Sequence, residues 1–285
     1  MLRPILVACA LVLTACGHAV TAEPPAAART QHTPAAAPLV ATPEVCPLPD
    51  SGFECEFQKR IEAARQYAES RPGTVGIVLH DRKTGATWRN ESADDLVWTA
   101  STIKLAMVVN LLERHRSGKI KLTSGDRGLM NAMLHTSDDT AADELWTKYG
   151  GTTFNAAFPK YGMTDLVAQH GYSDTFPYWG FQKCTADDLD RLINYVLDTV
   201  PAEDRAYIVE QMRNVGPPQQ WGVWGPDSGA KNGWSEEDGG WVMNSVGFVG
   251  PDERYTLAIM NNLRGEGGYD EGRATDTEIT RLLFR

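Results

Sequence analysis

The sequence predicts an α+β fold: an antiparallel five-stranded sheet flanked by the N- and C-terminal helices, with an inserted all-helical subdomain. Strand-like segments fall into two groups, within residues 53–98 and 229–285, and helical segments occupy residues 99–228 between them. The order helix, two strands, helical block, three strands, helix has no repeated strand–helix–strand unit, which a parallel sheet would need. The chain has 285 residues, 42% of them hydrophobic, so it is long enough to bury a large core.

The domain is expected to begin with a helix and a hairpin. Apolar residues recur at helical spacing over residues 55–70, and Arg71-Pro72-Gly73 ends that helix. Residues 74–80 are β-branched and apolar, a turn follows, and residues 86–90 return in the opposite direction. This pattern predicts two antiparallel strands.

The helical block extends over residues 101–198. Its first segment, residues 101–114, is almost wholly apolar from Leu105 to Leu112, and a helix that is apolar on all sides is normally buried. We therefore expect it to be the core helix. Further helices are predicted around residues 141–146 and 186–197, then strands over 229–234, 241–249 and 255–261, and a closing helix over 272–284.

The N-terminus has the pattern of a targeting segment. Arg3 precedes an apolar run over residues 5–15, which is too short to span a bilayer. Leu13-Thr14-Ala15-Cys16 is similar to the lipobox of bacterial lipoproteins, which implies a signal peptide over residues 1–15 and a lipid on Cys16. A plain secretory signal and a buried apolar helix are the alternatives. We expect an extracytoplasmic protein, lipid-anchored to the bacterial cell membrane.

Residues 16–45 are rich in Ala and Pro and show no apolar periodicity, which predicts a flexible tether before a domain over residues 46–285. If Cys9 leaves with the signal peptide and Cys16 carries lipid, three cysteines remain. Cys46 and Cys55 are close in sequence, so a disulfide between them is the simplest pairing, and Cys184 would be free. A bond from Cys184 to either of the other two stays open.

The composition excludes some functional classes. The formal net charge is -10 and there is no basic run, so no nucleic-acid partner is expected. The six histidines are scattered and no His/Cys cluster has zinc spacing, so we predict neither a metal nor another cofactor. A monomer is expected, although the oligomeric state cannot be derived from these residues.

Ser101 and Lys104 form the first candidate catalytic pair. A spacing of three residues in a helix would place the hydroxyl and the amine on one face, one turn apart. The apolar surroundings would lower the pKa of Lys104, which could then accept the proton of Ser101. The alternative is that Ser101 only caps the helix.

Two later clusters add matching chemistry. Ser137, within the sequence His135 to Ala142, supplies a second hydroxyl, and Lys231 supplies a second amine. Gly233 follows on the same predicted strand, and its missing side chain would let a substrate backbone lie close. Together these residues would complete an acyl-transfer site.

With these motifs, residues 53–285 resemble the penicillin-recognising serine hydrolases, and class A β-lactamases above all, whose motifs are S-x-x-K, S-D-N and K-T-G. The resemblance implies that Ser101 is the acylated nucleophile, Lys104 its proton-transfer partner and Ser137 the proton shuttle to the leaving nitrogen. It also implies that Lys231 and the residue after it, Asn232, bind the substrate carboxylate.

The oxyanion hole would consist of the backbone N–H groups of Ser101 and Trp234. Further tryptophans at 221, 224 and 241 are expected around the cleft, either as its lining or as surfaces for sugar rings.

Three departures from the family pattern bear on function. Asp139 replaces an asparagine, so it can pair with Lys104 but cannot donate a hydrogen bond to a substrate carbonyl while ionised. Asn232 replaces a threonine and still offers N–H donors. No E-x-x-L-N sequence, whose glutamate activates the deacylating water in class A enzymes, is present, and residues 162–184 contain only Asp165 and Asp174 as acids.

The sequence therefore predicts a serine acyl-transfer hydrolase that acts on β-lactams through an acyl-enzyme at Ser101 and deacylates slowly. A D-alanyl-D-alanine peptidase-like enzyme acting on peptidoglycan peptides is one alternative. A non-catalytic envelope lipoprotein that retains the binding cleft is the other.

Overall fold

The computed structural model describes residues 45–170 and 177–284. The predicted signal peptide with Cys9, the predicted lipid attachment site Cys16 and the predicted tether up to residue 44 lie outside the described residues, as does Asp174. Within the described ranges, no helix combines the length and the apolar character needed to cross a membrane.

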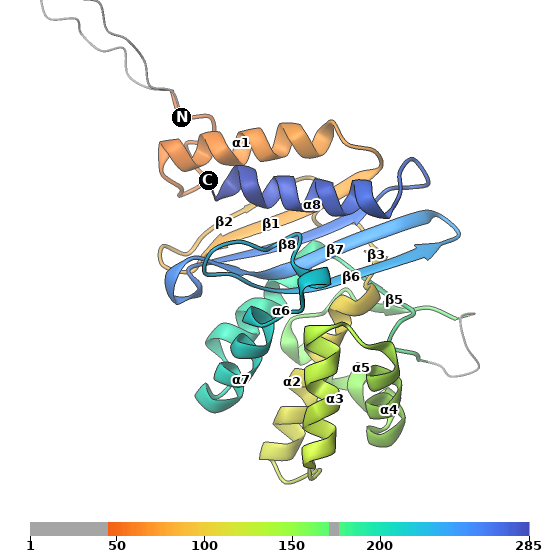
Figure 1. Ribbon diagram of the computed structural model, residues 1–285. Coiled ribbons are helices and arrows are strands. Elements are labelled where there is room, and N and C mark those ends of the chain that lie inside the picture. Colours follow the sequence, from red (N-terminus) through yellow and green to blue (C-terminus); the bar gives the residue numbers. More distant parts are fainter. Residues whose placement is uncertain (1–44, 171–176, 285) are drawn as a thin grey trace, which may run out of the picture. The chain divides into compact units, whose positions relative to one another are not determined.

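The predicted antiparallel five-stranded sheet is confirmed (Figure 1). Its order is β2-β1-β8-β7-β6, and each neighbouring pair is antiparallel. Strands from the two ends of the domain, β1 and β8, therefore lie next to each other in the middle, while β6 is an edge strand. The strands are β1 (Thr74–Asp81), β2 (Ala86–Arg89), β6 (Gly229–Glu237), β7 (Gly240–Val249) and β8 (Tyr255–Asn262).

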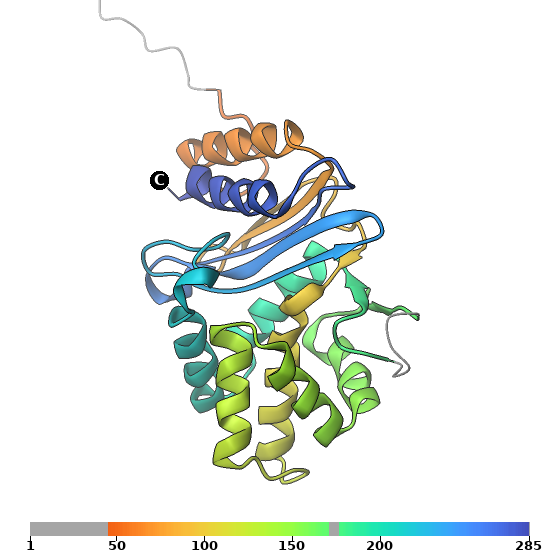
Figure 2. The same ribbon diagram turned by 45° about the vertical axis from the view of Figure 1, so that its right-hand side comes forward.

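Helices α1 (Cys55–Glu69) and α8 (Tyr269–Leu283) lie side by side on one face of this sheet, as Figures 1 and 2 show. The buried residues of α1 recur every three or four positions, so the helix turns one apolar stripe toward the sheet. Ile61 of α1 and Ile279 of α8 are fully buried in one core with the sheet residue Ile259. The flanking terminal helices are thus as predicted.

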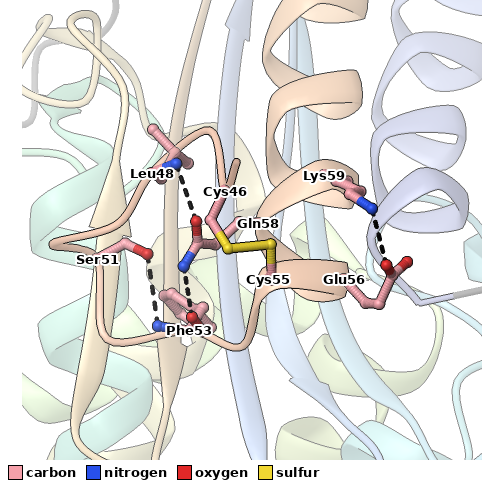
Figure 3. Close-up of a disulfide and its surroundings, with 8 residues drawn as sticks. All are labelled: Cys46, Leu48, Ser51, Phe53, Cys55, Glu56, Gln58 and Lys59. Atoms are coloured by element: carbon pink, nitrogen blue, oxygen red, sulfur yellow. Dashed lines mark hydrogen bonds and ion pairs between the residues drawn. A yellow bond between two sulfur atoms is a disulfide. The ribbon is translucent and has the colours of Figure 1, made fainter. Parts of the chain in front are cut away.

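The start of α1 is closed by a disulfide between Cys46 and Cys55, which confirms the expected pairing (Figure 3). Gln58 supports the loop inside this bridge. Its side-chain amide donates to the carbonyl of Phe53 at 2.6 Å, and its side-chain oxygen accepts from the N–H of Leu48 at 2.9 Å. The remaining cysteine, Cys184, is free and buried, also as expected.

The opposite face of the sheet is covered by the helical block. Two of its helices start at capping boxes, in which a threonine and an aspartate three residues later satisfy each other's backbone N–H groups. Its elements are η1 (Ala100–Thr102), α2 (Ile103–Arg116), α3 (Ser124–His135), α4 (Asp139–Tyr149), α5 (Gly151–Ala157), η2 (Phe158–Tyr161), α6 (Ala186–Asp198), α7 (Ala202–Arg213) and η3 (Pro217–Gln219); η4 (Pro251–Glu253) joins β7 to β8.

Helix α2 is the predicted core helix, and every residue from Ile103 to Leu112 is buried. One detail of the prediction is wrong. The α-helix does not begin at Ser101, because Ala100 has a left-handed φ of 45° and residues 100–102 form a 3₁₀ turn. The nucleophile candidate therefore precedes the helix that carries Lys104.

The helical block is confirmed with one addition, a small three-stranded sheet at its junction with the main sheet. Its strand order is β3-β5-β4, formed by Val97–Trp98, Gln182–Cys184 and Val167–Ala168. Strands of two or three residues are too short to show an alternating pattern, so the sequence did not indicate them. They anchor the segment that leads into η1.

Candidate active site

The candidate site lies where the edge strand β6 passes the turn η1 and the N-terminal end of α2. The closest approach is at Gly233. A Cβ atom added there would lie 2.7 Å from the backbone nitrogens of both Ser101 and Thr102, and 3.0 Å from the carbonyl oxygen of Thr99. Only glycine fits this contact. The strand backbone and the N–H of Ser101 are thereby brought together, as an oxyanion hole requires.

Ser101 is held at this point by strain and by one amide. The left-handed Ala100 directs the chain into the 3₁₀ turn, and such strain is typical of functional sites. Asn244 of β7 donates from its side-chain nitrogen to the carbonyls of Trp98 at 2.7 Å and Thr99 at 3.3 Å. The turn is thus fastened to the sheet, and Ser101 keeps 8% of its surface exposed.

Lys104 is completely buried, yet its ammonium has defined partners. Its Nζ donates to the carbonyl oxygen of Ser137 at 2.7 Å and to Oδ1 of Asp139 at 2.5 Å. The ring of Trp179 lies over it, with Nζ 4.6 Å from the ring centroid. Burial lowers the pKa of Lys104 below its ordinary value, and the Asp139 carboxylate offsets this only in part.

Ser137 joins the two predicted amines. Lys231 donates from Nζ to Oγ of Ser137 at 2.9 Å, while Lys104 bonds the carbonyl of the same residue. Ser137 has a left-handed φ of 61°, which lets its backbone and side chain face different partners. Lys231 also donates to the carbonyl of Asn232. Burial lowers the pKa of Lys231 well below its ordinary value, and repulsion from Lys104 adds a smaller effect in the same direction.

Asp139 is the first residue of α4 and reaches Lys104 from the exposed rim of the site, because 73% of its side chain is accessible. It accepts a hydrogen bond from Lys104, as the sequence indicated. An ionised carboxylate in this position offers no donor to a substrate carbonyl.

The structure places Asn232 differently from the prediction. Its side-chain nitrogen donates to the carbonyls of Gln219 at 2.7 Å and Trp221 at 3.2 Å, and its oxygen accepts from the hydroxyl of Ser245 at 2.7 Å. Strand residues alternate between faces, so Asn232 points away from the face of Lys231. Its side-chain nitrogen is thus engaged with the loop before β6, and carboxylate binding by Asn232 stays a prediction.

The tryptophans also differ from the expectation that they surround the cleft. The Trp234 ring packs edge-on against Trp221 at 6.2 Å and Tyr269 at 6.0 Å, and Trp241 contacts the same tyrosine at 5.6 Å. Trp224 joins the core beneath α1 and α8. These rings pack on the α8 side of the sheet, so a sugar-stacking role is not supported; the backbone N–H of Trp234 remains the candidate second oxyanion donor.

Within residues 162–184, where the glutamate of class A enzymes is missing, Trp179 lies against Lys104. Trp179 is 4% exposed, and its Nε1 donates to Asp143 of α4 at 2.7 Å. Asp165, one of the two acids of this segment, forms an ion pair with Arg191 of α6 at 2.8 Å. Asp165 is therefore engaged with α6 and takes no part in the contacts of Lys104.

Asn244, Asp143 and Trp179 were not found from the sequence. A weak signal existed for Asn244, because the polar pair Asn244-Ser245 interrupts the otherwise apolar strand β7. Neither Asp143 nor Trp179 has such a signal, since their meeting depends on tertiary structure. Among the described residues, no group of three or more His, Cys, Asp or Glu side chains is arranged to hold a metal ion.

Comparison with known proteins gives a consistent picture. The family Beta-lactamase2, described as the β-lactamase enzyme family, matches residues 56–125, which include Ser101 and Lys104. The candidate lipoprotein LppW of Mycobacterium tuberculosis and of Mycobacterium bovis is 29% identical over 256 residues, covering 83% of this chain and 77% of LppW.

Among solved structures, a β-lactamase from Burkholderia vietnamiensis aligns with a TM-score of 0.65 at 19% identity, covering 79% of this chain and 95% of that chain. A β-lactamase from Sphaerobacter thermophilus aligns with a TM-score of 0.63 at 20% identity and with the same coverage. The chain thus has a class A β-lactamase-like fold, its residues 56–125 match the β-lactamase family model, and it is homologous to a candidate lipoprotein.

Proposed function

We propose that this protein is a serine acyl-transfer enzyme that reacts with β-lactams, forms an ester at Ser101 and releases it slowly. The observation that carries the proposal is the convergence on Ser137. Lys104 binds its carbonyl and Lys231 binds its hydroxyl, while Gly233 of the same strand lies against the N–H of Ser101. These contacts support a site in which the two amines, the Ser137 hydroxyl and the backbone N–H of Ser101 act together.

Acylation would use these groups in sequence. Ser101 Oγ attacks the lactam carbonyl and gives its proton to Lys104, whose lowered pKa favours the neutral amine needed for this step. The N–H groups of Ser101 and Trp234 stabilise the oxyanion. The C–N bond then breaks, and the leaving nitrogen takes a proton from the hydroxyl of Ser137. Ser137 then regains a proton from the ammonium that Lys104 became on taking the proton of Ser101, so the protons balance, and Lys231 holds the Ser137 hydroxyl in place.

Deacylation has weaker support from the residues present. The carboxylates that act on Lys104 belong to Asp138, Asp139 and Asp143. Asp139 is bonded to Lys104 itself, and Asp143 binds side chains of the segment above it. Asp138 caps α4 by accepting from the N–H of Ala141. None of the three is placed like a base dedicated to water, so we expect a long-lived acyl-enzyme.

The likeness to LppW supports an envelope location, with the lipid on Cys16 anchoring the domain outside the cytoplasm. Substrates there would be β-lactams or peptidoglycan peptides that end in D-alanyl-D-alanine. A slow acyl-enzyme suits a peptidase that passes its acyl group on, and this is the second candidate function.

The test is to incubate the purified full-length protein with a penicillin and a chromogenic cephalosporin and to weigh the intact protein by mass spectrometry. We expect a covalent adduct that is absent in the Ser101→Ala variant and only slow colour change. Rapid turnover would contradict slow release. No adduct and no turnover would rule out reaction with β-lactams, and release of D-alanine from a wall peptide would then favour the peptidase.

A further inference from the structure

The segment that precedes β5 covers the amine of Lys104 with an indole ring. Nζ of Lys104 lies 4.6 Å from the centroid of the Trp179 ring, and the lysine has no exposed surface. Its Nζ donates hydrogen bonds to the carbonyl of Ser137 and to Asp139. The indole therefore occupies a side of the amine that would otherwise be open to water.

This ring is fixed in place by one carboxylate. Oδ1 of Asp143 accepts hydrogen bonds from Nε1 of Trp179 at 2.7 Å and from the hydroxyl of Tyr178 at 2.8 Å. Asp143 lies four residues after Asp139, so both project from the same face of α4. One turn of this helix thus holds the ammonium with Asp139 and the ring above it with Asp143.

Hydrolysis of an ester at Ser101 needs a water that can reach both the ester carbon and a base. The water oxygen bonds to that carbon, the bond to Ser101 Oγ breaks, the base removes a proton from water, and Oγ regains one. In the proposed function that base is Lys104, three residues after Ser101 in the sequence. A ring over its amine excludes the water that this step would use.

Resting on the proposed function, we propose that Trp179 determines the fate of the acyl-enzyme by excluding water from Lys104, and that Asp143 is the positioning residue that holds the ring there. Acylation needs no added water, because in the proposed function Lys104 itself takes the proton of Ser101. The acyl group is therefore protected from hydrolysis and kept for slow release or for transfer to another acceptor.

The test uses the full-length protein acylated with a penicillin, freed from excess reagent and followed over time by intact mass. We expect Trp179→Ala and Asp143→Ala to shorten the lifetime of the adduct about tenfold or more. Asp143→Asn keeps an oxygen acceptor for both donors and should retain most of the lifetime. Trp241→Ala is the matched control, because it removes an equally large ring from the α8 side of the sheet.

A purely structural role for Asp143 would lower the melting temperature without changing the ratio of acylation to deacylation rates, so both rates and the melting temperature are measured for each variant. Adducts of unchanged lifetime in Trp179→Ala would overturn the inference alone. Failure of the unmodified protein to form any adduct would remove the proposed function, and this inference with it.

Discussion

The two faces of the edge strand β6 differ in what their residues contact: one faces the candidate catalytic residues, and the other packs against a loop and aromatic rings. On one face Lys231 contacts Ser137 and Gly233 lies against Ser101, which are the candidate groups for proton transfer and charge stabilisation. On the other face Asn232 and Trp234 are occupied with a loop and with aromatic neighbours. Side chains one residue apart in sequence thus serve either chemistry or packing, according to the alternation of the strand.

Substitutions on the two faces should therefore have different effects, which experiments can separate. Substitutions on the Ser101 face should change reaction rates more than stability. Substitutions on the α8 face should change the free energy of unfolding more than the rate per folded molecule.

The largest effect is expected for Gly233→Ala. The added methyl group would lie 2.7 Å from two backbone nitrogens, so the strand and the Ser101 turn must move apart. Loss of one oxyanion donor typically costs about 100- to 1000-fold in rate, and we expect a decrease of this order in the rate of acylation. Mass spectrometry of the penicillin adduct measures it, and a rate within threefold of the unmodified protein would separate Gly233 from the reaction.

Asn232→Ala should lower the free energy of unfolding rather than the rate of acylation. It leaves the carbonyl of Trp221 without its donor, whereas the carbonyl of Gln219 keeps the backbone N–H of Trp221, and we expect a loss of about 1–3 kcal/mol in the free energy of unfolding, as for a buried unsatisfied group. Urea denaturation checks this. If acylation of the folded fraction instead falls by a hundredfold with little change in stability, Asn232 binds substrate after all.

Asp139→Asn sharpens the comparison on the reacting face. The carboxylate raises the pKa of Lys104, so its removal lowers that pKa further and increases the neutral fraction at neutral pH. We expect acylation to become faster by roughly the same factor as that fraction, and its rise with pH to shift to lower pH. Rates measured across pH 5–9 test this, and an unshifted profile would separate Asp139 from the basicity of Lys104.

The smallest effect is expected on the α8 face, at Asp276. This carboxyl is fully buried, burial raises its pKa well above the ordinary value, and Oδ1 accepts from Asn261 at 3.1 Å. A raised carboxyl pKa means that its stabilising contribution is present below the unfolded pKa and is lost as pH rises.

Asp276→Asn removes this titration and lets the new amide donate to the unpartnered Oδ1 of Asn261. We expect about 1 kcal/mol of added stability at pH 8 and less at pH 4, measured by urea denaturation. An equal gain at both values would mean that the carboxyl does not titrate in this range.

Much of the fold could be predicted because its elements are long and periodic. The apolar run of α2 and the strands β6 to β8 have patterns that local sequence reveals. The turn at Ser101 could not be predicted from local sequence. The residues before the left-handed Ala100 are held by tertiary contacts, namely the pairing of β3 and the hydrogen bond from Asn244.

For the site, the sequence selected Ser101, Lys104, Ser137 and Lys231, and their catalytic roles stay predictions; it did not reveal which face of β6 carries Asn232. Asn232 follows Lys231 directly, so strand alternation alone predicts that the two side chains face opposite sides of β6. The prediction for Asn232 followed the family pattern instead. The indole over Lys104 lay beyond sequence reasoning, because it depends on a pairing between α4 and a distant segment.

The disulfide at the start of α1 has a mechanical consequence. Everything N-terminal to Cys46 is joined covalently to Cys55 by the sulfur bridge as well as by the loop between them. A pulling force from that side enters the domain directly at the first residue of α1 and bypasses residues 47–54. Movement of an anchor would then be transmitted to a helix packed against the sheet, and the loop that supports its first turn would carry little of the tension.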